Sequence, residues 1–462
     1  MPPRFRIASV SVASAAAIGL IVPVAIVVSP PAFAEPCQGP AAGAQPTASQ
    51  NVKLPSPSAR QLVPIGHKPA GANEAAPLPK LGLLPRILNA LTPRSAQVQQ
   101  QAAVAPTPNP RVPQQQPVPV QPAPAPAAQP APGPDLTGPA ATSIVGWVTG
   151  PDSPAKTIER FGVTGTDLGI MWDNGGGQVL VAFGDTYGFC SIPGQQWRYN
   201  VLLRSQDRSL SNTLETTSSP LLRQGLSKQI INTIKAAPEE DGIIPTTGIS
   251  VGRAQYLNFM SIKQWESSGQ WSTNFSAIAV SGDDGQNWGV YPRTVRTPEA
   301  GNENFQMGAF LRPGPGDPYI YLFGTPPGRS GSAYVARVPA GFIPDLTKYE
   351  YWNADSNAWV PKNPAAATPV IPGPVGEMSA QFNTYLQKYL VLYCNGMNDV
   401  VARTASAPQG PWGPEQLLVP SMQIAGGIYA PFLHPWSTGK ELYFNLSLWS
   451  AYNVMLMKAT LP

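Results

Sequence analysis

The part of the chain from about Thr142 to Pro462 consists of short strand-like runs. Apolar or alternating segments recur there between Gly, Pro, Asn and Asp residues, and helical periodicity does not last beyond a few turns. Residues 221–236 are the best helical candidate. This pattern predicts an all-β fold. The roughly 320 residues involved are enough for one large core.

The strand-like runs fall into five sets of three to four strands each. Such a repeat predicts a five-bladed β-propeller, with a two-sheet sandwich as the alternative. Residues 281–288, SGDDGQNW, also fit the S-x-D-x-G-x-x-W turn called an Asp box, which is typical of the outer strands of propeller blades. The five sets cover residues 167–207, 249–288, 305–338, 377–404 and 428–459.

Residues 1–140 have a different composition. Residues 1–34 combine Arg4 and Arg6, a long apolar run and the ending Ala32-Phe33-Ala34, which predicts a signal peptide cleaved after residue 34. An uncleaved membrane anchor is the alternative. Residues 35–140 are rich in Pro, Ala and Gln, so we expect a disordered tether. The propeller should then occupy residues 141–462 of a secreted protein with no stable membrane insertion after cleavage.

Charge excludes some partners. Residues 1–140 hold nine Lys and Arg against three Asp and Glu, whereas the remainder holds twenty-one against twenty-three. The near-neutral propeller has no basic face, which argues against nucleic acid binding. We expect a monomer without a cofactor, and the sequence leaves open a structural calcium ion in the channel.

The three cysteines leave one unpaired if a disulfide forms. Cys190 and Cys394 each follow a predicted strand, and their pairing is one alternative. Cys37 pairing with either of them is the other alternative.

The best chemical lead is the hairpin predicted over residues 166–188. Two apolar runs flank the turn sequence Asp173-Asn174-Gly175-Gly176-Gly177, which suits a tight reversal. Asp167 and Asp185 then return to the same edge of the sheet. Diagonal neighbours across such a ladder lie ~7 to 8 Å apart. The alternative is that both aspartates serve only turn formation.

In a propeller, the sheet edge that carries Asp167 and Asp185 would lie at one mouth of the central channel. First strands of blades line the central channel, so Asp167, Glu303 and Glu377, at the starts of three predicted first strands, should surround one mouth with Asp185. Aromatic residues near the same mouth could stack on sugar rings or simply belong to the core. These are Tyr187, Trp197, Tyr429 and Trp449.

Other chemistries lack the required residues. His434 is the single histidine of the predicted propeller, which excludes a multi-histidine zinc site. Residues 248–252, GISVG, match the nucleophile-elbow pattern, but a strand and not a helix is predicted to follow. Phosphate-loop and dinucleotide motifs are absent. A carboxylate pair with aromatics fits glycosidic bond hydrolysis, in which ~6.5 to 9.5 Å between carboxylates implies inversion and ~5 Å implies retention. The diagonal spacing of the hairpin is closer to the first range, so we expect inversion.

Four motifs carry a resemblance to a known family. Residues 165–169 (GTDLG), 183–188 (FGDTYG), 376–379 (GEMS) and 429–431 (YAP) are similar to those of the actinobacterial endo-D-arabinanases, glycoside hydrolase family 183, formerly a domain of unknown function. The resemblance covers about residues 142–462. It implies a five-bladed glycosidase acting on the D-arabinan of arabinogalactan and lipoarabinomannan.

The resemblance also implies roles for residues. Asp167 and Asp185 become the catalytic pair. Because Asp167 lies on the predicted channel-lining strand, we expect it to be the base, which leaves Asp185 as the acid. Glu377 becomes a third acidic site residue. A non-catalytic propeller that binds or scaffolds envelope polysaccharide, and a glycosidase for another furanoside such as L-arabinan, remain as alternatives.

Overall fold

The computed structural model describes residues 136, 140–188, 197–232, 237, 239–266, 270–424 and 426–462. The predicted signal peptide, nearly all of the predicted tether, Cys37 and Cys190 lie outside these residues. No helix in the described ranges is both long and apolar enough to cross a membrane. The described part is all-β, with a single short α-helix, α2 (Thr157–Phe161), and several 3-10 turns. The 3-10 turns are η3 (Pro292–Thr294), η4 (Asn302–Phe305), η5 (Ala340–Phe342), η6 (Leu346–Lys348), η7 (Pro364–Ala366) and η8 (Ser421–Gln423).

Five antiparallel sheets form the blades of a five-bladed β-propeller, as predicted. The first blade contains β2 (Leu168–Asp173), β3 (Val179–Phe183), β6 (Val201–Ser205) and β7 (Thr216–Ser218). The second contains β10 (Gly242–Val251), β11 (Ala254–Trp265), β12 (Trp271–Ser281) and β13 (Gly289–Val290). The third contains β14 (Met307–Leu311), β15 (Tyr319–Thr325), β16 (Tyr334–Pro339), β17 (Glu350–Asn353) and β18 (Ala358–Pro361). The fourth contains β19 (Met378–Asn383), β20 (Lys388–Cys394), β21 (Val400–Ala405) and β22 (Gln416–Val419). The fifth contains β23 (Ile428–Leu433), β24 (Glu441–Leu448), β25 (Asn453–Thr460) and β1 (Ala141–Trp147).

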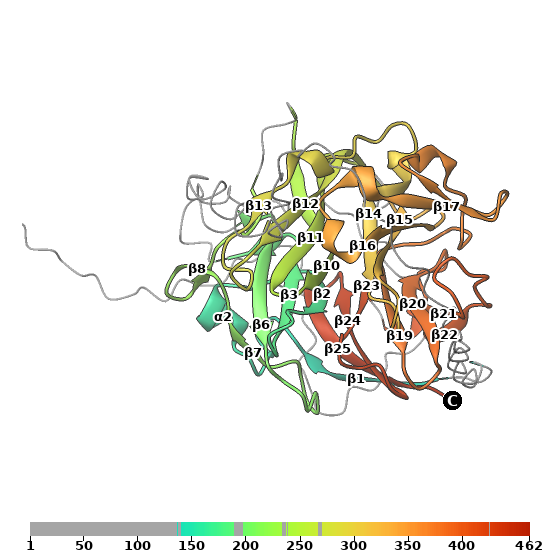
Figure 1. The fold of residues 1–462 in the computed structure, drawn as a ribbon. Helices are drawn as coiled ribbons and strands as arrows, with labels where there is room; N and C mark the ends of the chain where they lie inside the picture. Colours follow the sequence, from blue (N-terminus) through green and yellow to red (C-terminus); the bar gives the residue numbers. More distant parts are fainter. Residues whose placement is uncertain are drawn as a thin grey trace, which may run out of the picture. The chain divides into compact units, whose positions relative to one another are not determined.

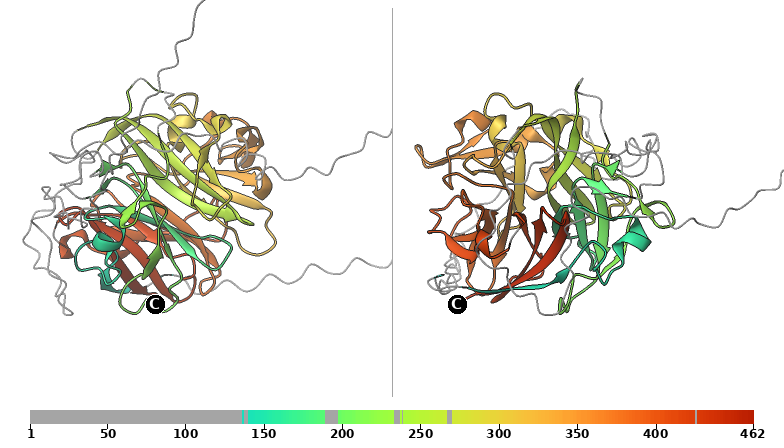
Figure 2. Two further views of the ribbon diagram at one scale, coloured as in Figure 1. Left: turned by 90° about the vertical axis from the view of Figure 1, so that its left-hand side faces the viewer. Right: turned by 180° about the vertical axis from the view of Figure 1, so that it is seen from behind.

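The core lies between neighbouring blades. Leu180 of the first blade and Leu257 of the second, both fully buried, belong to one apolar cluster. Val181 of the first blade and Val454 of the fifth belong to another. Apolar side chains on both faces of each sheet therefore join the blades into a ring, and the sequence colours follow that ring in Figures 1 and 2.

A strand from the N-terminal side closes the ring. β1 pairs antiparallel with β25, from Ala141 opposite Thr460 to Trp147 opposite Met455, and Figure 1 shows the two strands side by side. The sequence did not indicate this strand. Its pairing covers the edge that β25 would otherwise expose.

The segment expected to be helical is not. Within residues 221–232 the chain forms a small hairpin of β8 (Leu221–Arg223) and β9 (Leu226–Ser227). Gly225 has a φ of +77°, a conformation that glycine adopts readily, so the chain reverses there. A second two-stranded sheet pairs β4 (Thr186–Tyr187) with β5 (Trp197–Arg198).

The Asp box forms between β12 and β13, which confirms its predicted place in a blade. The Ser281 hydroxyl donates to Asp283 Oδ1 at 2.8 Å and accepts from the Gly285 backbone N–H at 3.0 Å. The Trp288 indole donates to the Gly285 carbonyl and is buried in the cluster between the first two blades.

Candidate functional site

One mouth of the propeller gathers polar and aromatic side chains from all five blades. Within each blade the start of the first strand pairs with the end of the second, as in Leu168 opposite Phe183 and Met378 opposite Tyr393. Residues at these positions therefore share one mouth, which we call the carboxylate mouth. In blade order its main residues are Asp167, Trp271, Arg329, Glu377 and Tyr429.

The predicted hairpin is present, and its register places the two aspartates opposite each other. Gly165 forms an antiparallel β-bridge with Tyr187, and the hydroxyls of Thr166 and Thr186 lie 2.7 Å apart. The Gly184 N–H donates to the Asp167 carbonyl at 3.2 Å. Asp167 thus faces Gly184 and Asp185 directly and not diagonally, so the diagonal spacing no longer supports inversion.

Strained backbone follows two of the site residues. Leu168 and Ala430, which come directly after Asp167 and Tyr429, have φ values of +69° and +54°. Each lies at an irregularity in its ladder. Bulges of this kind redirect side chains, and left-handed residues other than glycine persist where the surrounding structure holds them. The Leu168 N–H is held by the Ser447 hydroxyl at 2.9 Å.

Asp167 is enclosed by the mouth. The Tyr429 hydroxyl donates to Asp167 Oδ2 at 3.0 Å, whereas Asp167 Oδ1 is buried without a hydrogen-bond partner. Burial raises the pKa of Asp167 to about 7, and the Glu377 charge acts in the same direction. The Tyr429 hydrogen bond and the Arg329 charge oppose this rise. Asp167 therefore holds a proton at mildly acidic pH.

Asp185 lies beside a small aromatic cluster. Its side chain is 5% exposed. Tyr187, Trp197 and Tyr452 pack edge to face next to it. Burial raises the pKa of the Tyr452 hydroxyl, and the charges of Asp167 and Asp185 raise it further, which places both carboxylates near this one ring.

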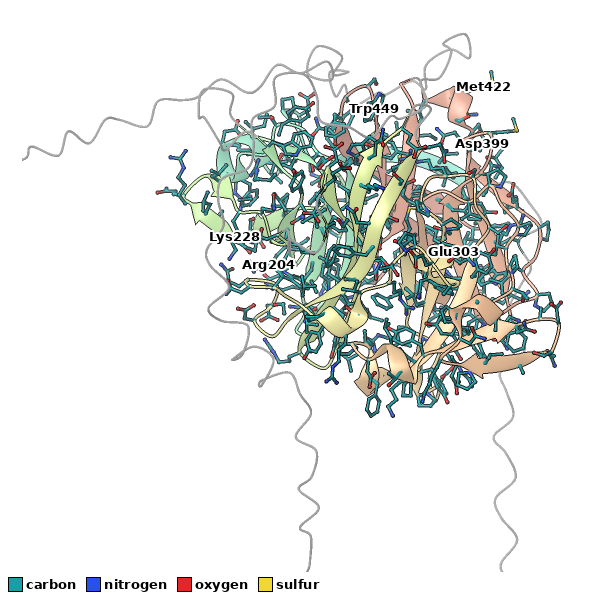
Figure 3. The ribbon with its side chains drawn as sticks, turned by 90° about the horizontal axis from the view of Figure 1, so that it is seen from above. Arg204, Lys228, Glu303, Asp399, Met422 and Trp449 are labelled. Carbon is teal, nitrogen blue, oxygen red and sulfur yellow. The ribbon has the colours of Figure 1, made fainter. Side chains whose placement is uncertain are left out.

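The aromatics predicted to stack on sugars differ in their exposure. Tyr187 and Trp197 are buried in the cluster just described, which fits the core alternative for both. Tyr429 is 1% exposed and uses its hydroxyl on Asp167. Trp449 is partly exposed, and its ring lies 6.4 Å from that of Tyr429 at the rim of the propeller (Figure 3). Trp449 is thus the best placed of the four to meet a ligand.

Arg329 is a site residue that the sequence did not indicate. It lies in the loop after β15 and donates to Glu377 through two contacts, Nε to Oε2 at 3.0 Å and Nη2 to Oε1 at 2.5 Å. Its guanidinium carbon lies 4.9 Å from the Trp271 ring centre and 5.5 Å from that of Tyr429. An arginine in a loop far from the carboxylates in sequence carries no signal that would single it out.

Glu377 lies where the sequence placed it, directly before β19, whereas Glu303 does not begin a strand. β14 begins at Met307, so Glu303 lies in the preceding turn η4 and the expected strand start is wrong. Its carboxylate accepts from the Gly301 N–H at 2.8 Å. Within the described residues no hydrogen bond or ion pair joins Glu303 to Asp167 or Glu377, and its place at this mouth stays a prediction.

Cys190 lies outside the described residues, so the predicted disulfide between Cys190 and Cys394 stays a prediction. Cys394 ends β20 and is buried. Its carbonyl accepts from the Gly376 N–H at 3.0 Å and so fixes the backbone before Glu377. Burial raises the pKa of the Cys394 thiol, and the Glu377 charge adds to the rise.

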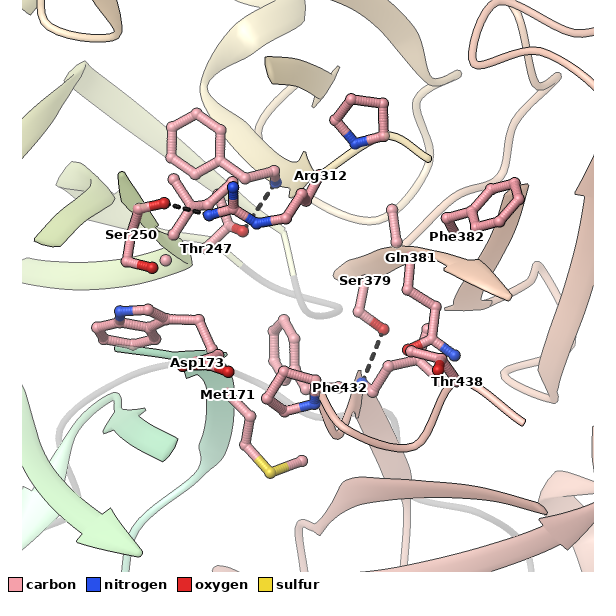
Figure 4. Close-up of a pocket in the computed structure, with 18 of the residues that line it drawn as sticks. Met171, Asp173, Thr247, Ser250, Arg312, Ser379, Gln381, Phe382, Phe432 and Thr438 are labelled. Carbon is pink, nitrogen blue, oxygen red and sulfur yellow. Dashed lines mark hydrogen bonds between the residues drawn. The ribbon is translucent and has the colours of Figure 1, made fainter. Parts of the chain in front are cut away.

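A cavity of about 540 Å³ lies at the opposite mouth, where the inner strands end (Figure 4). Several of its polar side chains are engaged within the protein. Asp173 accepts from the Gly175 N–H and the Trp436 indole, Ser379 accepts from the Leu433 N–H, and Arg312 donates to the Ser250 carbonyl. Gln381 Oε1 is buried there without a hydrogen-bond partner. The carboxylate mouth differs in its ionisable groups, because it brings the Asp167 carboxyl group close to the charges of Glu377 and Arg329.

Two other chemistries find no support in the described residues. No group of three or more His, Cys, Asp or Glu side chains there could hold a metal ion. His434 is 1% exposed, and burial lowers its pKa to about 4. Ser250 lies in β10, which turns directly into β11, so the strand-to-helix context of a nucleophile elbow is missing.

Gly184 leaves room for Asp167, which makes a testable prediction. A Cβ atom at position 184 would lie 2.4 Å from Asp167 Oδ1. Gly184→Ala should displace this carboxylate and lower the kcat of any reaction in which Asp167 takes part by about 10²-fold, because small misplacements of reacting groups are costly. Steady-state kinetics would measure the effect, with Gly341→Ala as a control because a Cβ there meets nothing within 4 Å and the backbone does not require glycine. Equal losses in both variants would contradict the prediction.

Comparison with known proteins identifies the family. Residues 152–458 match the family described as Domain of unknown function (DUF4185). Notoamide biosynthesis cluster protein J' of Aspergillus versicolor is 28% identical over 337 residues, which cover 68% of this chain and 90% of that protein. Similar sequences thus occur outside the actinobacteria.

Solved structures with a similar course of the chain are more distant in sequence. A chain from Bacteroides ovatus is 14% identical with a TM-score of 0.46, covering 65% of this chain and 87% of that one. The catalytic domain of a Coprinopsis cinerea GH62 α-L-arabinofuranosidase is 11% identical with a TM-score of 0.40. This match covers 69% of this chain and 96% of that domain. Because the family match extends over more than half of the sequence, this chain belongs to the family described as Domain of unknown function (DUF4185).

Proposed function

We propose that this protein is an exported glycoside hydrolase that cleaves D-arabinan internally. One observation carries the proposal: a hairpin places Asp167 opposite Asp185 at a propeller mouth, and burial raises the pKa of Asp167 to about 7. Glycosidic bond hydrolysis requires one protonated and one ionised carboxyl group on either side of the bond. The four motifs shared with endo-D-arabinanases support D-arabinan as the substrate.

The environment of Asp167 favours this residue as the acid, which leaves Asp185 as the second carboxylate, the reverse of the expectation from the sequence. Neutral Asp167 would protonate the leaving glycosidic oxygen as its bond to the anomeric carbon breaks. In an inverting reaction Asp185 would take the proton from the water that attacks this carbon, and in a retaining reaction the Asp185 carboxylate would attack the carbon itself. A carboxyl group whose pKa lies near 7 suits an acid that works at neutral pH.

The assignment predicts a pH dependence. Loss of the Asp167 proton removes the acid, so kcat/KM should fall about tenfold for each pH unit above about 7. Initial rates of cleavage between pH 5 and 9 would measure this limb. A rate that stays constant up to pH 9 would contradict Asp167 as the acid.

Incubation with purified polysaccharides tests the function itself. The protein without its signal peptide should release short oligosaccharides from mycobacterial arabinogalactan and lipoarabinomannan but not from plant L-arabinan, as followed by chromatography. Release of arabinose alone would contradict internal cleavage. Saturable binding by folded protein without new reducing ends would favour a polysaccharide-binding propeller instead.

The proposed export has its own test. The protein recovered outside the cells of its host should begin at Glu35, as determined by N-terminal sequencing. A protein that keeps its first residues would support a membrane anchor.

A further inference from the structure

Arg329 and Glu377 form an ion pair that bridges the third and fourth blades at the carboxylate mouth. The side chains are 15% and 11% exposed, and two parallel contacts join them. A forked arginine–carboxylate pair fixes the plane of both groups. Neither residue contacts Asp167 by a hydrogen bond, so any role at that carboxylate is indirect.

The ion pair reaches Asp167 through Tyr429. The Arg329 guanidinium lies over the rings of both Trp271 and Tyr429, at 4.9 and 5.5 Å. A guanidinium over an aromatic face attracts the ring and limits its movement. The Tyr429 hydroxyl at the far end of that ring donates to Asp167 Oδ2. The four side chains are therefore linked by successive contacts across the mouth, in the order Glu377, Arg329, Tyr429 and Asp167.

We propose that Arg329, held by Glu377, is the positioning residue that keeps the Tyr429 hydroxyl hydrogen-bonded to Asp167. The positive charge of Arg329 also offsets the negative charge of Glu377 near the Asp167 carboxyl group. This inference rests on the proposed role of Asp167 as the acid. Within the described residues no hydrogen bond joins Arg329 to Asp167, and Arg329 acts on Asp167 through the ring that it covers. The opposite charges of the pair have opposite effects on Asp167: Glu377 favours its protonated form and Arg329 favours its ionised form.

The ionisable groups that surround Asp167 determine how a titration is interpreted. The Tyr429 and Tyr452 hydroxyls stay neutral at physiological pH because burial raises their pKa values. Their charge therefore does not change over the working range. The other ionisable side chains at this mouth are Asp185, Tyr187, Arg329, Glu377 and Cys394.

Three single variants and one double variant test the proposal. Arg329→Gln leaves Glu377 as an uncompensated anion and should raise the pKa of Asp167. Glu377→Gln leaves the cation and should lower it. Tyr429→Phe removes only the hydroxyl and should raise it. The double variant Arg329→Gln/Glu377→Gln should titrate between the two charge variants.

The measurement is the pKa of Asp167, followed by ¹³C NMR of the labelled carboxyl carbon in the whole secreted chain, with kcat and KM measured beside it. Arg329→Gln should also lower kcat by about 10²-fold with a smaller change in KM, since positioning is lost and not substrate affinity. The titration needs no substrate, so a protein that cleaves no arabinan would refute the proposed function and leave this test intact.

The direction of the shifts decides the outcome. Shifts of the Asp167 pKa in opposite directions for the two charge variants support the proposal. Shifts of the Asp167 pKa in the same direction for both charge variants, or an unchanged Asp167 pKa in Arg329→Gln, would overturn the proposal. If a single charge variant does not fold, the double variant and Tyr429→Phe decide: an unchanged kcat in the double variant, or an unchanged Asp167 pKa in Tyr429→Phe, would also overturn it.

Discussion

Asp167→Asn is expected to lower kcat on D-arabinan by about 10³-fold or more while the propeller stays folded. The substitution keeps the size of the side chain and an acceptor for the Tyr429 hydroxyl, but it removes the proton that the leaving oxygen needs. General acid catalysis contributes about 10² to 10⁴-fold to enzymatic rates. Asp185→Asn should cause a loss of similar size by removing the second carboxylate.

A change of substrate separates the two roles. An aryl arabinofuranoside with an acidic phenol leaves without protonation, so it should restore much of the rate of Asp167→Asn but not that of Asp185→Asn. The reverse pattern would give Asp185 the acid role. Asp355→Asn makes the same chemical change on the exposed turn after β17 and should keep full activity. Full activity in Asp167→Asn and Asp185→Asn would refute the catalytic assignment.

Local sequence signals were sufficient where the chain pairs with its near neighbours. The Asn and Gly residues after Asp173 predicted the hairpin that aligns Asp167 with Asp185, and the five strand sets predicted the blades. The Asp box in the second blade could likewise be read from residues 281–288. Each of these features is determined by turn chemistry and alternation within a few tens of residues.

Features that depend on distant pairing were missed. β1 is a short strand whose partner β25 lies at the other end of the chain, so its neighbours in sequence give no sign of it. Arg329 is recognisable only once the ring of blades brings it over Tyr429. Glu303 does not begin a strand as predicted, because the turn η4 separates it from β14. The residues around a propeller mouth come from all blades, and their grouping is a property of the closed ring.

The buried carboxyl group of Asp167 should also reduce the stability of the fold as pH rises. Its pKa is about 7 in the folded protein and about 3.8 in the unfolded chain. Between these values only the folded state holds the proton, so unfolding releases it and stability falls with increasing pH. Above about pH 7 the folded protein carries the buried charge in full, and the loss levels off.

Asp167→Asn removes this dependence because the amide does not titrate. Relative to the parent, the variant should therefore gain stability between pH 4 and 7, by at most about 4 kcal/mol since each pKa unit corresponds to ~1.36 kcal/mol. Denaturant unfolding at pH 4, 5.5, 7 and 8.5 would measure the gain. An amide NH₂ buried at the unpaired Oδ1 position costs a constant amount at every pH. The test is therefore the slope of the stability difference with pH and not its sign at one pH. Asp355→Asn should follow the parent throughout, and a parallel profile for Asp167→Asn would show that the Asp167 carboxyl group ionises normally and is no candidate for the acid.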